Sequence, residues 1–158
     1  MNQLLQAVSS LSKKDLIIRA PKQSNTCQEE KTSLNISNDT TNDMLNIRLD
    51  GGLYPRGDAC DWLIVGMLRK SEARGGLLEL KGRHIEKAIP QLETTIGKLK
   101  DSLRGCMPDL RTAMIVSKGG KIPMSKLQLK QKHFIKKYHI RLTRETNGST
   151  KALSTVLE

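Results

Sequence analysis

Three ionisable residues lie at the ends of two apolar segments of strand length. Asp61 opens the segment 61–68, and Glu79 and Lys81 stand on either side of Leu80 at the end of the segment 76–82. Side chains two residues apart on a strand point to the same face, so Glu79 and Lys81 are predicted to emerge side by side. Pairing of the two segments as a hairpin would bring Asp61 to the same end of the sheet. Two carboxylates and an ammonium group would then share one site.

These groups suit the hydrolysis of a phosphate ester with a divalent cation. Mg²⁺ is held by one or two carboxylates together with waters and often phosphate oxygens. Such an ion lowers the pKa of a bound water and stabilises charge on the phosphate. A neighbouring ammonium group can position that water and neutralise the transition state. We therefore predict Asp61 and Glu79 as metal ligands, Lys81 as the catalytic ammonium group, and Mg²⁺ (or Mn²⁺) as the cofactor.

The pattern of Asp61 followed by Glu79-Leu80-Lys81, on two apolar strands with an amphipathic helix after them, resembles the PD-(D/E)XK nuclease superfamily. Restriction endonucleases and archaeal-type Holliday junction resolvases are members of it. The resemblance covers residues 45 to 116, and the proline that gives the family its name is replaced here by Cys60. It implies an α/β fold of the restriction-endonuclease-like type, with three layers and a central mixed β-sheet flanked by helices. It also implies a metal-dependent DNA endonuclease, structure-selective or concerned with defence or recombination.

The resemblance implies further site residues. Gln91, on the helix that follows Lys81, matches a glutamine that many members place near the metal. Members also commonly carry a metal-facing glutamate on an early helix, for which Glu29 and Glu30 are the candidates; a solvated surface pair is the competing interpretation. Asp58 competes with Asp61, but it lies in a turn, where aspartate is ordinary. The resemblance alone implies a homodimer that cuts both strands.

Hydrophobic periodicity predicts the elements around this site. We expect one domain, made of an N-terminal helix and polar segment (1–43), a catalytic core (44–122) and a basic C-terminal helix and strand (123–158). Pro90 predicts a kink or a helix restart. The polar residues 21–43 predict a loop or a short helix, and the tail from Asn147 is expected to fray. The predicted helices are 3–18, 84–104 and 125–138, and the predicted strands are 44–49, 61–68, 76–82, 109–117 (parallel to 76–82) and 140–144.

The charge of the chain predicts a polyanionic partner. The formal net charge is +11 and the isoelectric point is about 9.8. All ionised side chains between Asp109 and Glu145 are basic, which leaves that region repelling itself unless an external anion neutralises it. We predict that nucleic acid, DNA in preference to RNA, contacts Lys118, Lys121, Lys126, Lys130, Lys136, Lys137 and Arg141.

Composition predicts a cytoplasmic protein without a membrane partner. No apolar run approaches the length that spans a bilayer, and the N-terminus lacks the features of a signal peptide. Cys27, Cys60 and Cys106 are widely spaced and odd in number, which fits a reducing compartment and no disulfide framework.

Two other function classes stay open. One is a nuclease-like fold without catalysis, acting as a nucleic-acid-binding or regulatory protein. The other is an RNase or toxin domain, because no sequence pattern separates the two nucleic acids. We do not expect a serine or cysteine hydrolase or an ATP-using enzyme, because the sequence has no nucleophile elbow and no phosphate-binding loop.

Overall fold

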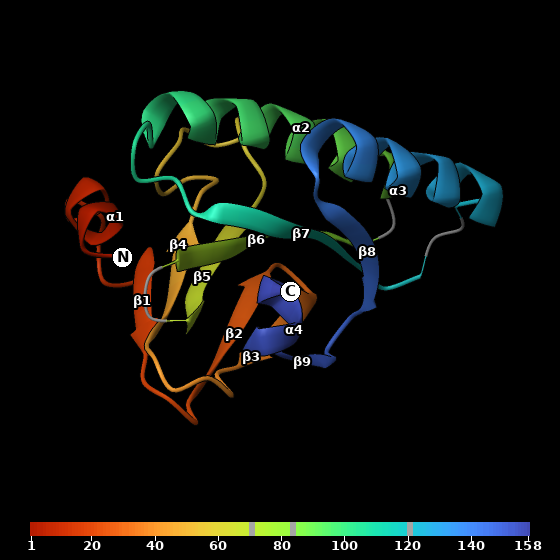
Figure 1. The fold of residues 1–158 in the computed structure, drawn as a ribbon. Helices are drawn as coiled ribbons and strands as arrows, with labels where there is room; N and C mark the ends of the chain where they lie inside the picture. Colours follow the sequence, from red (N-terminus) through yellow and green to blue (C-terminus); the bar gives the residue numbers. More distant parts are fainter. Residues whose placement is uncertain (70–71, 83–84, 120–121) are drawn as a thin grey trace.

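The computed structural model describes residues 1–69, 72–82, 85–119 and 122–158 (Figure 1). The helices within these ranges are α1 (Asn2–Ala7), α2 (Ile85–Ser102), α3 (Met124–Tyr138) and α4 (Leu153–Leu157). The strands are β1 (Leu16–Arg19), β2 (Ser24–Glu29), β3 (Thr32–Ser37), β4 (Met44–Arg48), β5 (Trp62–Arg69), β6 (Glu72–Gly82), β7 (Asp109–Ser117), β8 (Arg141–Thr146) and β9 (Thr150–Ala152).

A six-stranded mixed sheet forms the centre of the molecule, in the order β1-β4-β5-β6-β7-β8. Neighbours from β1 to β6 are antiparallel, whereas β6, β7 and β8 are parallel. Parallel neighbours need a crossover, and α2 and α3 supply the two crossovers. Both helices lie on one face, and the small sheet β2-β3-β9 with α4 lies on the other (Figure 1). The predicted α/β class and a mixed sheet flanked by helices are confirmed.

The hairpin of β5 and β6 is buried on both faces. Leu63 and Leu77 pack into the core on the helix side, while Ile64 and Leu78 pack into the core on the side of the small sheet and α4. Alternate residues therefore serve opposite layers. This explains the nearly continuous apolar runs that predicted these strands.

The N-terminal prediction is wrong in two places. The helix predicted over 3–18 ends at Ala7, and residues 16–19 instead pair with β4 as the edge strand β1. The polar residues 21–43 form the hairpin of β2 and β3, neither a loop nor a helix. Every second residue of that hairpin is buried, among them Cys27, Leu34 and Ile36. The strand period was present, but two of its buried positions, Asn25 and Thr32, are polar, which weakened the alternation of apolar and polar residues.

The C-terminal tail does not fray, because it ends in a docked helix. Leu153, Val156 and Leu157 of α4 are buried against the central sheet. Three side chains of the sheet donate to the last carbonyls of this helix, which have no partner within it. These hydrogen bonds run from Arg141 Nη2 to Thr155 O (2.8 Å), from Thr112 Oγ1 to Val156 O (2.8 Å) and from Arg74 Nη1 to Leu157 O (3.4 Å).

Helix α2 continues through Pro90, so the predicted restart there is wrong. A proline inside a helix lacks the N–H that would bond to the carbonyl four residues earlier, here that of Glu86. Both residues are exposed, so water can reach that carbonyl. The apolar face of α2, which includes Leu92 and Ile96, remains continuous against the sheet.

Two glycines of the β5–β6 hairpin make room for α4. A Cβ atom on Gly76 would lie 2.5 Å from Val156 Cγ1 and 2.7 Å from Thr112 Oγ1. A Cβ atom on Gly66 would lie 2.7 Å from Leu157 Cδ1 and 2.9 Å from Leu153 Cδ2. The flat surface of the sheet at these positions is therefore what lets the short helix approach the backbone.

We predict that Gly76→Ala lowers the free energy of unfolding by about 1–3 kcal/mol, because the new methyl group overpacks the contact with α4. The measurement is urea unfolding followed by circular dichroism. Gly97→Ala is the control. Gly97 lies in α2 with open space around it, so the same substitution there should stabilise the protein by about 0.5–1 kcal/mol. Equal stability of Gly76→Ala and the wild type would contradict the docking of α4 on this surface.

Candidate active site

Asp61, Glu79 and Lys81 come together at one end of the β5–β6 hairpin. Trp62 pairs with Leu78 across the two strands, which places the preceding Asp61 opposite Glu79. Asp61 Oδ2 accepts a hydrogen bond from the backbone N–H of Leu80 at 2.6 Å. Lys81 Nζ lies 2.7 Å from Glu79 Oε1. The grouping predicted from the spacing of the three residues is present in the structure.

The carboxylate of Glu79 is completely buried. Its side chain has no exposed surface, whereas that of Lys81 is 26% exposed. Apart from the close ion pair with Lys81, no well-directed hydrogen bond from the described residues reaches either carboxylate oxygen. Buried carboxylates are normally paired and hydrogen-bonded because desolvating a charge is costly. The two oxygens of Glu79 can therefore accept a further cation.

Burial raises the pKa values of both acids. Burial raises the pKa of Glu79 to about 8, helped by the nearby charge of Asp61 and opposed by Lys81. Burial also raises the pKa of Asp61 to about 6, although the N–H of Leu80 and the charge of Lys81 oppose this. Two acids whose pKa values are raised in this way favour a shared positive charge, and a divalent cation supplies one.

A second acidic and basic pair lies beside Asp61. Arg48 donates from Nη2 to Glu29 Oε2 at 2.8 Å and from Nε to Asp50 O at 3.1 Å. The charges of Glu29 and Asp50 contribute to the raised pKa of Asp61, which places them close to it. Glu29 ends the strand β2, so its position on an early helix, which the resemblance implies, is wrong. Glu30 lies exposed in the following turn with a φ of 48°.

Helix α2 anchors the segment that leads into Asp61. Gln91 Nε2 donates to Ala59 O at 3.4 Å. The hydroxyl of Thr95 accepts from the backbone N–H of Cys60 at 2.7 Å and donates to Gln91 O at 2.7 Å. In the described structure Gln91 thus contacts the backbone before Asp61. Thr95 was not predicted as a site residue, because a threonine beside an apolar helical stripe gives no sequence signal of such a role.

Asp58 takes no part in the hydrogen bonds that anchor this segment to α2. Its Oδ2 is 3.0 Å from Lys98 Nζ, and half of its side chain is exposed. It therefore has a cation of its own on α2, which leaves Asp61 as the acid opposite Glu79.

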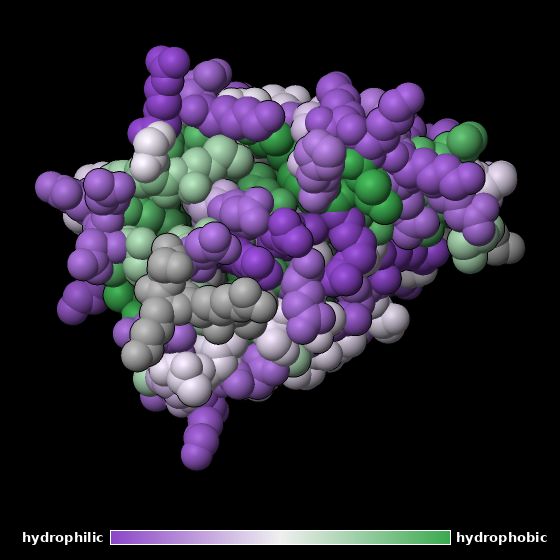
Figure 2. Space-filling model, in the orientation of Figure 1, coloured by the Kyte–Doolittle hydropathy of each residue, from purple (hydrophilic) through white to green (hydrophobic). Residues whose placement is uncertain are grey.

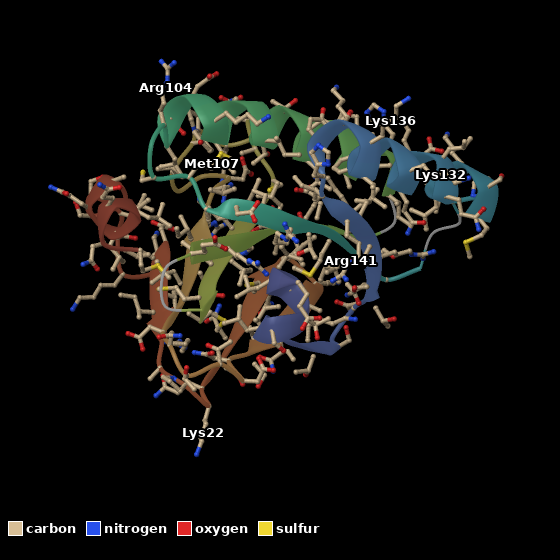
Figure 3. The ribbon with its side chains drawn as sticks, in the orientation of Figure 1. Lys22, Arg104, Met107, Lys132, Lys136 and Arg141 are labelled. Carbon is tan, nitrogen blue, oxygen red and sulfur yellow. The ribbon has the colours of Figure 1, made fainter. Side chains whose placement is uncertain are left out.

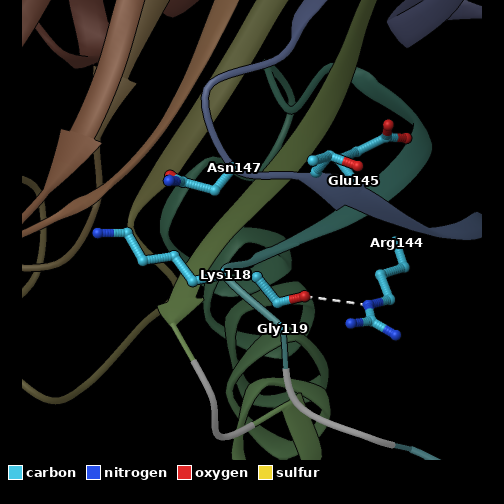
Figure 4. A pocket seen from close by; sticks show the side chains of 7 residues that line it. Lys118, Gly119, Arg144, Glu145 and Asn147 are labelled. Atoms are coloured by element: carbon cyan, nitrogen blue, oxygen red, sulfur yellow. Dashed lines mark hydrogen bonds between the residues drawn. The ribbon is translucent and has the colours of Figure 1, made fainter.

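A hollow of about 560 Å³ lies at the same edge of the sheet (Figure 4). Because β6, β7 and β8 are parallel, their carboxyl ends meet, and Ser117 pairs with both Gly82 and Thr146. In Figure 4 the end of β6 lies beside Lys118. Arg144 Nε donates to Ser117 Oγ at 3.0 Å across the hollow. The lining residues are Ser117, Lys118, Gly119, Arg144, Glu145, Thr146 and Asn147.

Several basic residues that were predicted to bind nucleic acid have partners within the protein. Lys126 Nζ lies 2.6 Å from Glu86 Oε1, and Lys137 Nζ lies 4.0 Å from Glu93 Oε1 and over the ring of Tyr138. Arg141 donates to the carbonyl of Thr155, as described for α4.

The other lysines that were predicted to contact nucleic acid differ in solvent exposure. Lys118 and Lys136 are exposed and Lys130 is half-buried, while Lys121 lies outside the described residues. Figure 3 shows Lys132 and Lys136 projecting from α3, and Figure 2 shows hydrophilic side chains over α3 and β8.

Comparisons of the chain with protein-family models, curated proteins and solved structures gave no match. Within the described ranges, no group of three or more histidine, cysteine, aspartate or glutamate residues is arranged to hold a metal ion. No helix among the described residues is long and apolar enough to cross a membrane.

We predict that the metal-free protein becomes less stable as the pH rises from about 4.5 to about 8. Glu79 has a folded-state pKa of about 8 against an ordinary value of 4.5, so the folded state holds a proton that the unfolded state has lost. The folded state therefore binds more protons in this window, and its stability falls by up to about 5 kcal/mol across it. Thermal unfolding at several pH values measures this, and Glu79→Gln should flatten the profile.

Millimolar Mg²⁺ or Mn²⁺ should reverse that loss, with more effect at pH 8 than at pH 5.5. At a ten-fold excess over the dissociation constant the gain is about 1.4 kcal/mol, or about 3–5 °C. Asp61→Asn should abolish the gain, whereas Asp58→Asn should retain it because Asp58 pairs with Lys98. An equal rise for the wild type and Asp61→Asn would speak against a metal between Asp61 and Glu79.

Proposed function

We propose that this protein is a Mg²⁺-dependent nuclease that hydrolyses phosphodiester bonds of DNA. The observation that carries the proposal is the buried carboxylate of Glu79, paired with Lys81 at 2.7 Å and facing Asp61 at one edge of a mixed sheet. A chain that buries a carboxylate with so few hydrogen-bond donors accepts a cost in stability, and function is the usual reason for such a cost.

The donor set fits a magnesium ion. Asp61 and Glu79 would hold it, and two carboxylates suffice because waters and substrate phosphate complete the coordination of Mg²⁺. The absence of a larger acidic cluster among the described residues is therefore compatible with this metal. When bound, the ion would supply an activated water and stabilisation of charge on the phosphate.

Lys81 would act as a cation and not as a base. Burial lowers the pKa of its ammonium group, but the charge and proximity of Glu79 outweigh this, so the net pKa is raised. The group stays protonated at neutral pH and is partly exposed, so a substrate can reach it. A fixed positive charge beside the phosphate stabilises the negative charge that develops during cleavage.

The arrangement of the sheet supports a restriction-endonuclease-like fold as part of this proposal. The antiparallel strands β4, β5 and β6 are followed by the crossover helix α2 and the parallel strand β7. This matches the mixed sheet flanked by helices of a restriction-endonuclease-like fold. The excess of positive charge supports a nucleic-acid substrate. The preference for DNA and the pairing of two subunits rest on the resemblance alone, and a cytoplasmic location rests on the three free cysteines.

A second candidate is a nucleic-acid-binding protein with this fold and no catalysis. One observation favours it: Lys81 already neutralises Glu79 within the protein, so the site is partly charge-balanced without a metal. Such a protein would bind nucleic acid through its exposed basic residues and leave the strand intact.

We predict that the protein cuts plasmid or branched DNA when Mg²⁺ or Mn²⁺ is added. Asp61→Asn, Glu79→Gln and Lys81→Met should each lower the cleavage rate by at least about 10²-fold. The first two remove the charge of a metal ligand, and the third removes the positive charge beside the reacting phosphate. Asp58→Asn is the matched control and should keep the wild-type rate. Gel assays measure cutting, and circular dichroism checks that each variant folds.

Three results would change this proposal. Equal binding of DNA by the wild type and Lys81→Met, with no cutting by either, would favour the binding protein. Cleavage of RNA alone would make the protein an RNase. Cleavage that persists in Asp61→Asn would place the chemistry elsewhere.

A further inference from the structure

The hollow at the carboxyl ends of β7 and β8 has the chemistry of a phosphate-binding site. Two of its lining residues, Lys118 and Arg144, carry positive charge. Its carboxylate, Glu145, is already paired with Lys151, at 2.7 Å between Glu145 Oε2 and Lys151 Nζ. The lining therefore keeps a net positive charge, which favours an anion.

The polar groups of the hollow leave donors for a ligand. Ser117 is buried, and its hydroxyl accepts a hydrogen bond from Arg144, so its own proton can be donated to a phosphate oxygen. Lys118 is exposed, and no carboxylate among the described residues forms an ion pair with it. In Figure 4 the side chains of Lys118 and Asn147 extend in the direction away from Arg144.

The hollow also adjoins the candidate active site. Lys81 and Gly82 end β6, and Gly82 pairs with Ser117, so the two sites are separated by one strand-to-strand step. Neighbouring strands lie about 5 Å apart. Neighbouring phosphates of one nucleic-acid strand can therefore reach both sites. A volume of about 560 Å³ is within the range of sites that bind a small ligand and is large enough for a nucleotide.

We infer that this hollow binds the phosphate of a nucleotide that flanks the cleaved bond, with Lys118, Arg144 and the hydroxyl of Ser117 as its contacts. The inference rests on the proposed function, because it assigns the flanking nucleotide to a strand that also reaches Glu79 and Lys81. The substrate strand then continues past the cleaved bond toward β8. The hollow positions the strand and takes no part in the chemical step.

The experiment uses the metal-free wild-type protein, so that binding is observed without cleavage. Inorganic phosphate and the 5′-phosphorylated thymidine dinucleotide pTpT are titrated separately and followed by ¹⁵N–¹H correlation spectra. We expect saturable shifts of the backbone amide signals of Ser117, Lys118, Gly119 and Asn147 with both ligands, and tighter binding of pTpT. Phosphate binding without tighter binding of the dinucleotide would overturn the assignment to a strand.

Lys118→Gln tests the proposed contact, and Arg104→Gln is the matched control. Arg104 is exposed and precedes the amino end of β7, whereas the hollow follows its carboxyl end (Figure 3). Lys118→Gln should weaken pTpT binding and lower the salt dependence of oligonucleotide binding by about one unit of log–log slope. Arg104→Gln should leave both unchanged, and an equal effect of the two variants would overturn the inference.

The two proposals fail in different ways. Saturable, Lys118-dependent binding of pTpT by a protein that never cuts nucleic acid would support the hollow and end the nuclease proposal. Cleavage that depends on Asp61 and Lys81, with no shifts at the hollow and normal cleavage by Lys118→Gln, would support the nuclease and overturn the hollow.

Discussion

The buried ion pair between Glu79 and Lys81 constrains the rest of the central sheet. A carboxylate without solvent contact needs a cation beside it, and the spacing of two residues along β6 supplies that cation on the same face. A slip of one residue in the pairing of β5 and β6 would exchange the layers that Glu79 and Leu80 face. The same slip would remove Asp61 from its hydrogen bond with the backbone of Leu80. The same register of β5 and β6 therefore packs the core and assembles the site.

The remaining elements position this end of the hairpin. Helix α2 holds the segment before Asp61 through Thr95 and Gln91. The packing of α2 in the core therefore also fixes the position of Asp61. Because both crossovers after β6 are helical, the carboxyl ends of β6, β7 and β8 lie at one edge. That edge carries the candidate active site and the basic hollow next to it. The small sheet adds Glu29 at the end of β2, whose charge reaches Asp61 and which pairs with Arg48 of β4.

The small sheet and α4 are held by contacts between distant parts of the chain. Strand β3 pairs with β9, and Ser33 donates from its backbone N–H to Asn147 Oδ1 at 2.8 Å. Asp39 accepts from the backbone N–H of Ser154 at the start of α4, at 2.9 Å. These hydrogen bonds satisfy polar segments that have few apolar residues of their own. The segment 21–43 and the C-terminal tail thus order each other, and the glycine surface of β5 and β6 admits the helix that joins them.

What the sequence determined by itself follows from local periodicity. The apolar runs of 61–68, 76–82 and 109–117 predicted the central strands, and the helical stripe after 76–82 predicted α2. Two-residue spacing predicted the meeting of Asp61, Glu79 and Lys81, because a hairpin joins neighbours along the chain. Only the tertiary structure decided the burial of Cys27 and Leu34 and the order of the C-terminal tail, because their partners lie far away in sequence. It alone also decided the anchoring by Thr95, the position of Glu29 and the hollow around Ser117, because these depend on how separate elements pack and not on any local pattern.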